Sequence, residues 1–133
     1  PWDMQYAAEK VSSTGNDQII LTERGTAFGY NNLVSDMRSV VIMKRLGYPV
    51  LYDATHSVHI PGGLGHTSGG QREMVFPLAR AAVAAGADGL FIEVHESPEK
   101  ALSDSATMLA IDQLMPLLKQ AKEIRTLLLG VRD

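Results

Sequence analysis

Three short apolar runs, rich in β-branched residues, recur along the chain and are separated by longer stretches of helical period. The runs predict strands at residues 18–22, 48–53 and 89–93. The longer stretches predict helices at residues 3–13, 32–46, 71–85 and 106–129. Gly15, Gly47 and Gly86 stand where the first three helices are expected to end. Pro116 is expected either to kink the last helix or to start a new segment after Leu114.

This alternation of strand and helix predicts parallel strands joined by helical crossovers. A doubly wound open sheet and a (β/α)8 barrel both fit the pattern. A complete barrel takes about 250 residues and eight strands, so the predicted strands would form under half of one. The chain also opens on Pro1 without an initiator Met, already in an amphipathic pattern. We therefore expect a chain that starts within a longer fold.

Composition narrows the class of protein. Of the 133 residues, 45% are apolar and 20% charged, as in soluble globular domains. The net charge of −3 gives no basic surface for nucleic acid or an anionic membrane. No apolar run reaches the roughly 18 residues of a membrane span, and no signal peptide is visible. With no cysteine, thiolate nucleophiles, disulfides and zinc-thiolate sites are excluded within residues 1–133. We expect a soluble, cytoplasmic domain.

Charged residues collect where each predicted strand ends. Arg24 follows the first strand, His56 the second, and Glu93 ends the third. The carboxyl ends of parallel strands meet on one face, and in barrels that face carries the active site. We therefore predict that these side chains belong to one site.

His56, Glu93 and Asp104 offer one imidazole and two carboxylates, a ligand set that suits Mn, Fe or Zn acting as a Lewis acid. No compact metal motif is present, and the residues have another interpretation. Glu93 and Arg24 would then form a structural ion pair, and His56 would be a hydrogen-bonded loop residue. The spacing alone leaves both open.

Two neighbouring features fit anionic ligands. The planar fork of Arg24 matches phosphate or carboxylate, although a salt bridge with Glu23 or Asp53 fits equally well. Residues 61–70 hold five glycines, whose ordering costs backbone entropy, so the segment suits a mobile lid. A connector without function is the alternative. Ser68 and free backbone N–H groups there would hold an oxyanion.

Several segments are similar to one family, 3-deoxy-D-manno-octulosonate 8-phosphate synthase. They are LTERGTAFGYNNL at 21–33, DATHSV at 53–58, GGLGHTSGG at 62–70, ADG at 87–89, EVH at 93–95 and KALSD at 100–104. The resemblance covers nearly the whole chain. It implies a (β/α)8 TIM barrel, of which residues 1–133 would be the C-terminal half, roughly the last three βα units.

The same resemblance implies a function. The family condenses phosphoenolpyruvate with D-arabinose 5-phosphate and releases phosphate, on the pathway to the inner sugar of lipopolysaccharide. The chain would then belong to a transferase, a cytoplasmic homotetramer, and would be inactive when isolated from the rest of the barrel.

The family's site residues are carried over by motif. Arg24 and His56 would be catalytic and bind phosphoenolpyruvate, while His59 and Ser68 would contact the pentose phosphate. In metal-dependent members His56, Glu93 and Asp104 would bind Mn, Fe or Zn together with a Cys that lies before Pro1. In the other members an Asn replaces that Cys, and there is no cofactor.

Two positions depart from the family pattern, and two other functions remain open. His59 stands where Gln is expected, and His66 where an acidic residue is usual, so acceptor specificity is less defined than reaction class. The nearest alternative enzyme is 3-deoxy-D-arabino-heptulosonate 7-phosphate synthase, which usually has Pro-Ser-His at 54–56. A non-catalytic half-barrel that acts as an interaction module is the alternative from another class.

Overall fold

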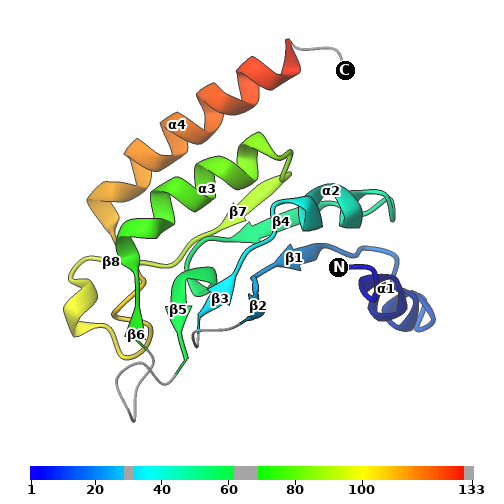
Figure 1. The fold of residues 1–133 in the computed structure, drawn as a ribbon, viewed down its shortest axis with the longest axis horizontal. Helices are drawn as coiled ribbons and strands as arrows, with labels where there is room; N and C mark the ends of the chain where they lie inside the picture. Colours follow the sequence, from blue (N-terminus) through cyan, green and yellow to red (C-terminus); the bar gives the residue numbers. More distant parts are fainter. Residues whose placement is uncertain (29–31, 62–68, 131–133) are drawn as a thin grey trace.

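The computed structural model describes residues 1–28, 32–61 and 69–130, and its centre is a three-stranded parallel sheet (Figure 1). β4 (Val50–Asp53) lies between β1 (Leu21–Glu23) and β7 (Gly89–Phe91). Pairing of Leu21 with Val50, and of Leu51 with Gly89, sets the register. The predicted α/β class with parallel strands is confirmed.

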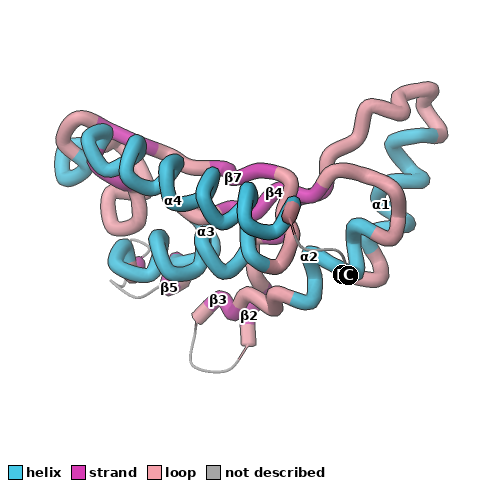
Figure 2. Tube along the Cα trace, turned by 90° about the horizontal axis from the view of Figure 1, so that it is seen from above, coloured by secondary structure: helices cyan, strands magenta, loops and turns pink. Residues whose placement is uncertain are grey.

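Helices connect these strands in the predicted order. They are α1 (Met4–Ser12), α2 (Arg38–Lys44), α3 (Val75–Ala84) and α4 (Ile111–Leu129). α2 packs on β1 and β4, whereas α3 packs on β4 and lies beside α4 (Figures 1 and 2). Gly47 and Gly86 lie just beyond α2 and α3 with φ of +85° and +97°. Glycine adopts this conformation without steric cost, so both helices end there as predicted.

The core surrounds β4, which explains why this strand is almost wholly apolar. Val50 and Tyr52 are fully buried, together with Val40 of α2 and Val75 of α3. The Tyr52 hydroxyl satisfies its hydrogen-bonding capacity inside the core, 2.9 Å from Ser35 Oγ and 2.8 Å from Ser57 Oγ. Burial raises the pKa of Tyr52, so its hydroxyl stays neutral at pH 7.

Short strand pairs follow the carboxyl ends of the sheet. β2 (Thr26–Ala27) pairs with β3 (Leu33–Val34), β5 (His59–Ile60) with β6 (Gly69–Gly70), and β8 (Val94–His95) with β9 (Leu109–Ala110). Three 3-10 turns, η1 (His56–Val58), η2 (Arg72–Met74) and η3 (Pro98–Lys100), complete the connections. In Figure 1 β2, β3, β5 and β6 lie together on one side of the sheet.

The structure corrects several predicted boundaries. The helix expected at 32–46 begins only at Arg38, because Leu33 pairs with Ala27 across a hairpin. The first strand lies at 21–23 rather than 18–22, since its ladder starts where Leu21 N–H meets Pro49 O. The last helix begins at Ile111 and runs unbroken through Pro116, so a new segment after Leu114 is wrong.

β1 and β7 each pair only with β4 among the three main strands, which leaves an unpaired edge on both within the described residues. Residues 62–68, with Ser68 and His66, lie outside the described ranges, so the expected lid has no structural account. Within the ranges described, none of the helices has the length and apolar character needed to cross a membrane.

Candidate active site

The parallel sheet brings the three strand ends to one edge. Arg24 follows β1, His56 follows β4, and Glu93 comes two residues after β7. Because these strands run in the same direction, the backbone delivers all three residues to the same end of the fold.

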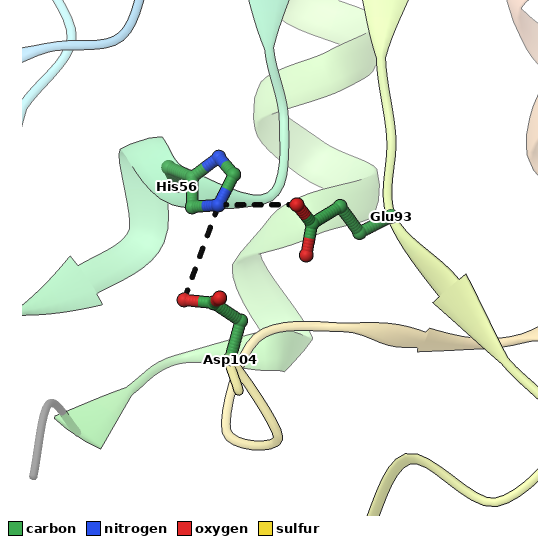
Figure 3. A group of neighbouring side chains, drawn as sticks. All are labelled: His56, Glu93 and Asp104. Atoms are coloured by element: carbon green, nitrogen blue, oxygen red, sulfur yellow. Dashed lines mark ion pairs between the residues drawn. The ribbon is translucent and has the colours of Figure 1, made fainter. Parts of the chain in front are cut away.

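His56, Glu93 and Asp104 form a tight cluster (Figure 3). His56 Nε2 lies 3.4 Å from Glu93 Oε1 and 3.9 Å from Asp104 Oδ1. One donor atom from each residue lies within 4.8 Å of the other two. The three side chains are part-buried, with 19%, 30% and 23% of their surfaces exposed, so they are sheltered but reachable.

Asp104 is held in an unusual backbone conformation. Its φ is +54°, a region that non-glycine residues seldom occupy. Its carbonyl accepts the N–H groups of Thr107 and Met108, each at 2.9 Å, and Arg72 donates to the neighbouring Ser105 carbonyl. Such conformations persist only where surrounding contacts enforce them, and they gather at functional sites.

Glu93 is positioned from both sides. Its N–H donates to Thr55 Oγ1 at 2.8 Å, and its carbonyl accepts the N–H of Leu109 at 3.1 Å. Thr55 is buried, with 1% of its surface exposed, and directly precedes His56. The segment after β4 therefore fixes the start of the segment that carries Glu93.

His59 lies in the same cluster. Its Nε2 is 2.9 Å from Asp104 Oδ1, and its ring centroid is 5.2 Å from that of His56. His59 Nε2 is buried and has no hydrogen-bond partner among the described residues. Burial lowers the pKa of His59; His56 and Arg24 add to this, while Asp104 and Asp53 oppose it. The ring is therefore neutral at pH 7.

Arg24 is exposed beside these residues, on a turn that Glu23 stabilises. Glu23 Oε1 accepts the N–H of Gly25 at 2.6 Å, and Gly25 has φ of +86°. Within the described ranges Arg24 makes no ion pair with Glu23, Asp53 or Glu93. The guanidinium therefore remains available to an anionic ligand.

The cluster fits a divalent cation. Carboxylates at 3.4 and 3.9 Å from His56 Nε2 are too far for good hydrogen bonds, yet close enough to share a cation. His59 Nε2 also lies 2.9 Å from Asp104 Oδ1, so a second imidazole adjoins the cluster. One imidazole and two carboxylates suit Mn, Fe or Zn, which is one of the two interpretations that the spacing left open.

Asp53 is the residue that the sequence interpretation undervalued. Its carboxylate lies 2.9 Å from His56 Nδ1, and only 6% of its surface is exposed. A sequence signal existed, since the carboxylate of an aspartate three residues before a candidate histidine can reach forward to the imidazole within one turn. The prediction treated Asp53 only as a possible partner of Arg24.

Comparisons with known proteins identify the family of the chain. The model of the DAHP synthetase I family matches residues 1–130. The chain is 63% identical over 93% of its length to the 2-dehydro-3-deoxyphosphooctonate aldolase of Geobacter sulfurreducens, of which the match covers 46%. It is 58% identical over 98% of its length to the 2-dehydro-3-deoxyphosphooctonate aldolase of Syntrophotalea carbinolica, and that match covers 47% of the relative. The chain thus spans about half the length of the curated relatives it matches.

A solved structure supports the fold. The phospho-2-dehydro-3-deoxyheptonate aldolase (DAHP synthase) of Thermotoga maritima superposes with a TM-score of 0.76 at 36% identity. The match covers 92% of this chain and 34% of that protein. The predicted fold class, part of a (β/α)8 barrel, is therefore confirmed.

Proposed function

Because the chain belongs to the DAHP synthetase I family, we propose that the protein carrying it condenses phosphoenolpyruvate with D-arabinose 5-phosphate. The products are 3-deoxy-D-manno-octulosonate 8-phosphate and phosphate, on the route to a lipopolysaccharide sugar. The observation that carries this proposal is the high identity to relatives named for the octulosonate reaction. Identity to the heptulosonate enzyme of Thermotoga maritima is lower, at 36%.

The strand-end residues suit the donor half of this reaction. Phosphoenolpyruvate carries a phosphate and a carboxylate, so its site needs cationic or N–H donor groups. Arg24 is exposed at the end of β1 and is not engaged by the carboxylates around it. Its planar fork binds the phosphate bidentately and fixes the orientation of the molecule. His56 lies at the adjoining strand end, where it serves the reacting carbons.

A divalent metal would be held by His56, Glu93 and Asp104 together with a ligand from the rest of the barrel. When bound, it supplies Lewis-acid polarisation of an oxygen at the reacting centre. The protein's own contribution is a sheltered cluster whose donor atoms already lie within 4.8 Å of one another. If the remaining ligand is absent, the same residues orient water or the acceptor aldehyde without metal.

The acceptor side distinguishes the two named reactions. An octulosonate has eight carbons and phosphoenolpyruvate supplies three, so the acceptor has five; a heptulosonate requires a four-carbon acceptor. We assign His59 and Ser68 to the pentose phosphate. The position of His59 beside His56 and Asp104 supports contact with an acceptor that approaches the cluster.

Phosphate release measured with both acceptors tests the proposal. The full-length protein should turn over phosphoenolpyruvate with arabinose 5-phosphate far faster than with a four-carbon aldose phosphate. Preference for the four-carbon acceptor would assign the heptulosonate reaction. Absence of turnover with either acceptor would favour a non-catalytic interaction module. Assays with and without a chelator reveal whether a metal takes part.

We also propose that residues 1–133 form the C-terminal half of one barrel domain. The unpaired edges of β1 and β7 support this, because a closed barrel has no free edges. The isolated chain should aggregate or be inactive, whereas the full-length protein should be a cytoplasmic homotetramer. Phosphate release by the isolated chain, and light scattering of the full-length protein, test these expectations.

A further inference from the structure

Asp53 makes a set of contacts that converge on a single neighbour. Its Oδ1 accepts the backbone N–H of His56 at 2.9 Å and that of Thr55 at 3.2 Å. Its Oδ2 lies 2.9 Å from His56 Nδ1. One buried carboxylate thus holds both the main chain and the imidazole of His56.

The contact with Nδ1 determines which ring nitrogen carries the proton. An ionised carboxylate can only accept hydrogen bonds, so the nitrogen facing it must donate. The proton of a neutral His56 therefore lies on Nδ1, and the lone pair on Nε2 points toward Glu93 and Asp104. The opposite tautomer would place two lone pairs against each other at Asp53.

We propose that Asp53 is a positioning residue that holds His56 in the Nδ1–H tautomer, so that Nε2 is free to bind a cation or to accept a proton. The inference rests on the proposed function for its purpose, but the tautomer can be tested without it. Carboxylates that bond the second nitrogen of a metal-binding histidine commonly orient the ring and raise its basicity.

The variant Asp53→Asn tests this directly. The amide oxygen can replace Oδ1 and keep the two backbone contacts, which leaves the NH2 group facing His56 Nδ1. That arrangement forces the proton onto Nε2 and occupies the lone pair that faces the carboxylates. Asp88→Asn is the matched control, because Asp88 also accepts a backbone N–H but lies at the opposite end of the sheet.

The decisive measurement is ¹⁵N NMR of histidine-labelled, metal-free full-length protein at a pH where the ring is neutral. The His56 signals are assigned by their loss in His56→Gln. We expect a protonated Nδ1 in the wild type and in Asp88→Asn, and a protonated Nε2 in Asp53→Asn. A wild-type His56 protonated on Nε2 would overturn the proposal even if Asp53→Asn failed to fold.

Titration with Mn²⁺, followed by its EPR signal, gives a second readout. If the wild type binds Mn²⁺, Asp53→Asn should weaken that binding roughly 10- to 100-fold, and Asp88→Asn should not change it. Unchanged affinity in a folded Asp53→Asn protein would remove the positioning role. A wild type that does not bind Mn²⁺ would count against the metal part of the proposed function, while NMR alone would still decide the tautomer.

Discussion

Asp53 and Asp88 occupy opposite ends of the same sheet and use their carboxylates differently. Asp53 ends β4, whereas Asp88 directly precedes β7 at the amino end. Asp88 Oδ1 accepts from Lys44 Nζ at 2.7 Å, and Oδ2 accepts from Val50 N–H at 2.9 Å. Both aspartates therefore accept from a side-chain donor and from a backbone N–H, Asp53 within the loop that follows β4 and Asp88 across to β4 and α2.

The two aspartates differ in the further contacts that their side-chain partners, Lys44 and His56, make. Lys44 also donates to the Gly86 carbonyl at 2.9 Å, so the contacts around Asp88 close on one another and tie α2 to the start of β7. The partner of Asp53 instead directs its second nitrogen at two more carboxylates. Similar hydrogen bonds thus tie elements of the fold together at the amino end and orient residues of the proposed site at the carboxyl end, the end that carries the active site in barrels.

His56→Ala, at the carboxyl end of the sheet, should have the largest effect on turnover. If His56 acts at the reacting centre, as we propose, its loss should lower turnover of the full-length protein about 100-fold or more, with little change in KM. His95→Ala is the control, because His95 is exposed and its Nδ1 only accepts the Ser97 N–H. Near-normal turnover in His56→Ala would mean that the histidine is structural.

Arg24→Ala tests whether the carboxyl end of the sheet binds the phosphate of phosphoenolpyruvate. Removing the charged hydrogen bonds that we propose between Arg24 and the substrate phosphate should raise KM for phosphoenolpyruvate roughly 10- to 100-fold. Arg24→Lys should restore only part of this, since Lys keeps the charge but not the fork. Arg38→Ala serves as control, because Arg38 is 82% exposed and pairs with Asp36. Full recovery by lysine would show that charge alone matters.

Gly70→Ala tests whether the close packing of Gly70 against Thr107 holds Asp104 in position. A Cβ at Gly70 would overlap Thr107 Cγ2 and would also lie 3.3 Å from the Ala106 carbonyl oxygen, and Thr107 is fully buried. The overlap should cost about 1–3 kcal/mol in urea unfolding and weaken any metal binding, because Thr107 N–H holds the Asp104 carbonyl.

The double variant Gly70→Ala/Thr107→Ser isolates that contact. Serine removes the clashing methyl group but keeps the hydroxyl, so stability should return toward that of Thr107→Ser alone. Gly130→Ala should be tolerated, because its Cβ would meet only the Leu127 carbonyl at 3.4 Å. A destabilised double variant would show that the loss has another origin.

Asp88→Asn should have the smallest effect, confined to stability. Burial alone would raise the pKa of Asp88, but the hydrogen bonds from Lys44 and Val50 outweigh it and the pKa is lowered. A lowered pKa in the folded state stabilises the protein above the ordinary value of 3.8, and this contribution is lost as the pH falls below it. We expect a loss of about 1 kcal/mol at pH 7, discounted for partial exposure, since asparagine still accepts from Val50.

Urea unfolding at pH 7 and pH 3 checks the sign. The wild type should lose its advantage over Asp88→Asn at the lower pH, while turnover at pH 7 stays normal in both. A larger difference at pH 3 would contradict the assigned direction. Lowered turnover in Asp88→Asn would contradict the prediction that the amino end of the sheet affects stability alone.

The sequence by itself determined the alternation of strands and helices, the helix ends at Gly47 and Gly86, and the residues at the strand ends. These features are local: a buried strand needs a short apolar run, and a helix ends where glycine permits a positive φ. Once the strands are parallel, the common edge of Arg24, His56 and Glu93 follows from chain direction alone.

Only the tertiary structure decided which of these residues touch. The distances of His56 from Glu93 and Asp104, the positive φ of Asp104 and the burial of His59 depend on segments far apart in the chain. The hairpin in place of the start of the predicted second helix also depends on tertiary structure. It forms because Leu33 pairs with Ala27, and the helical period of the sequence contains no information on that pairing. Strand pairing and side-chain packing are non-local interactions, and they override local propensity wherever the two compete.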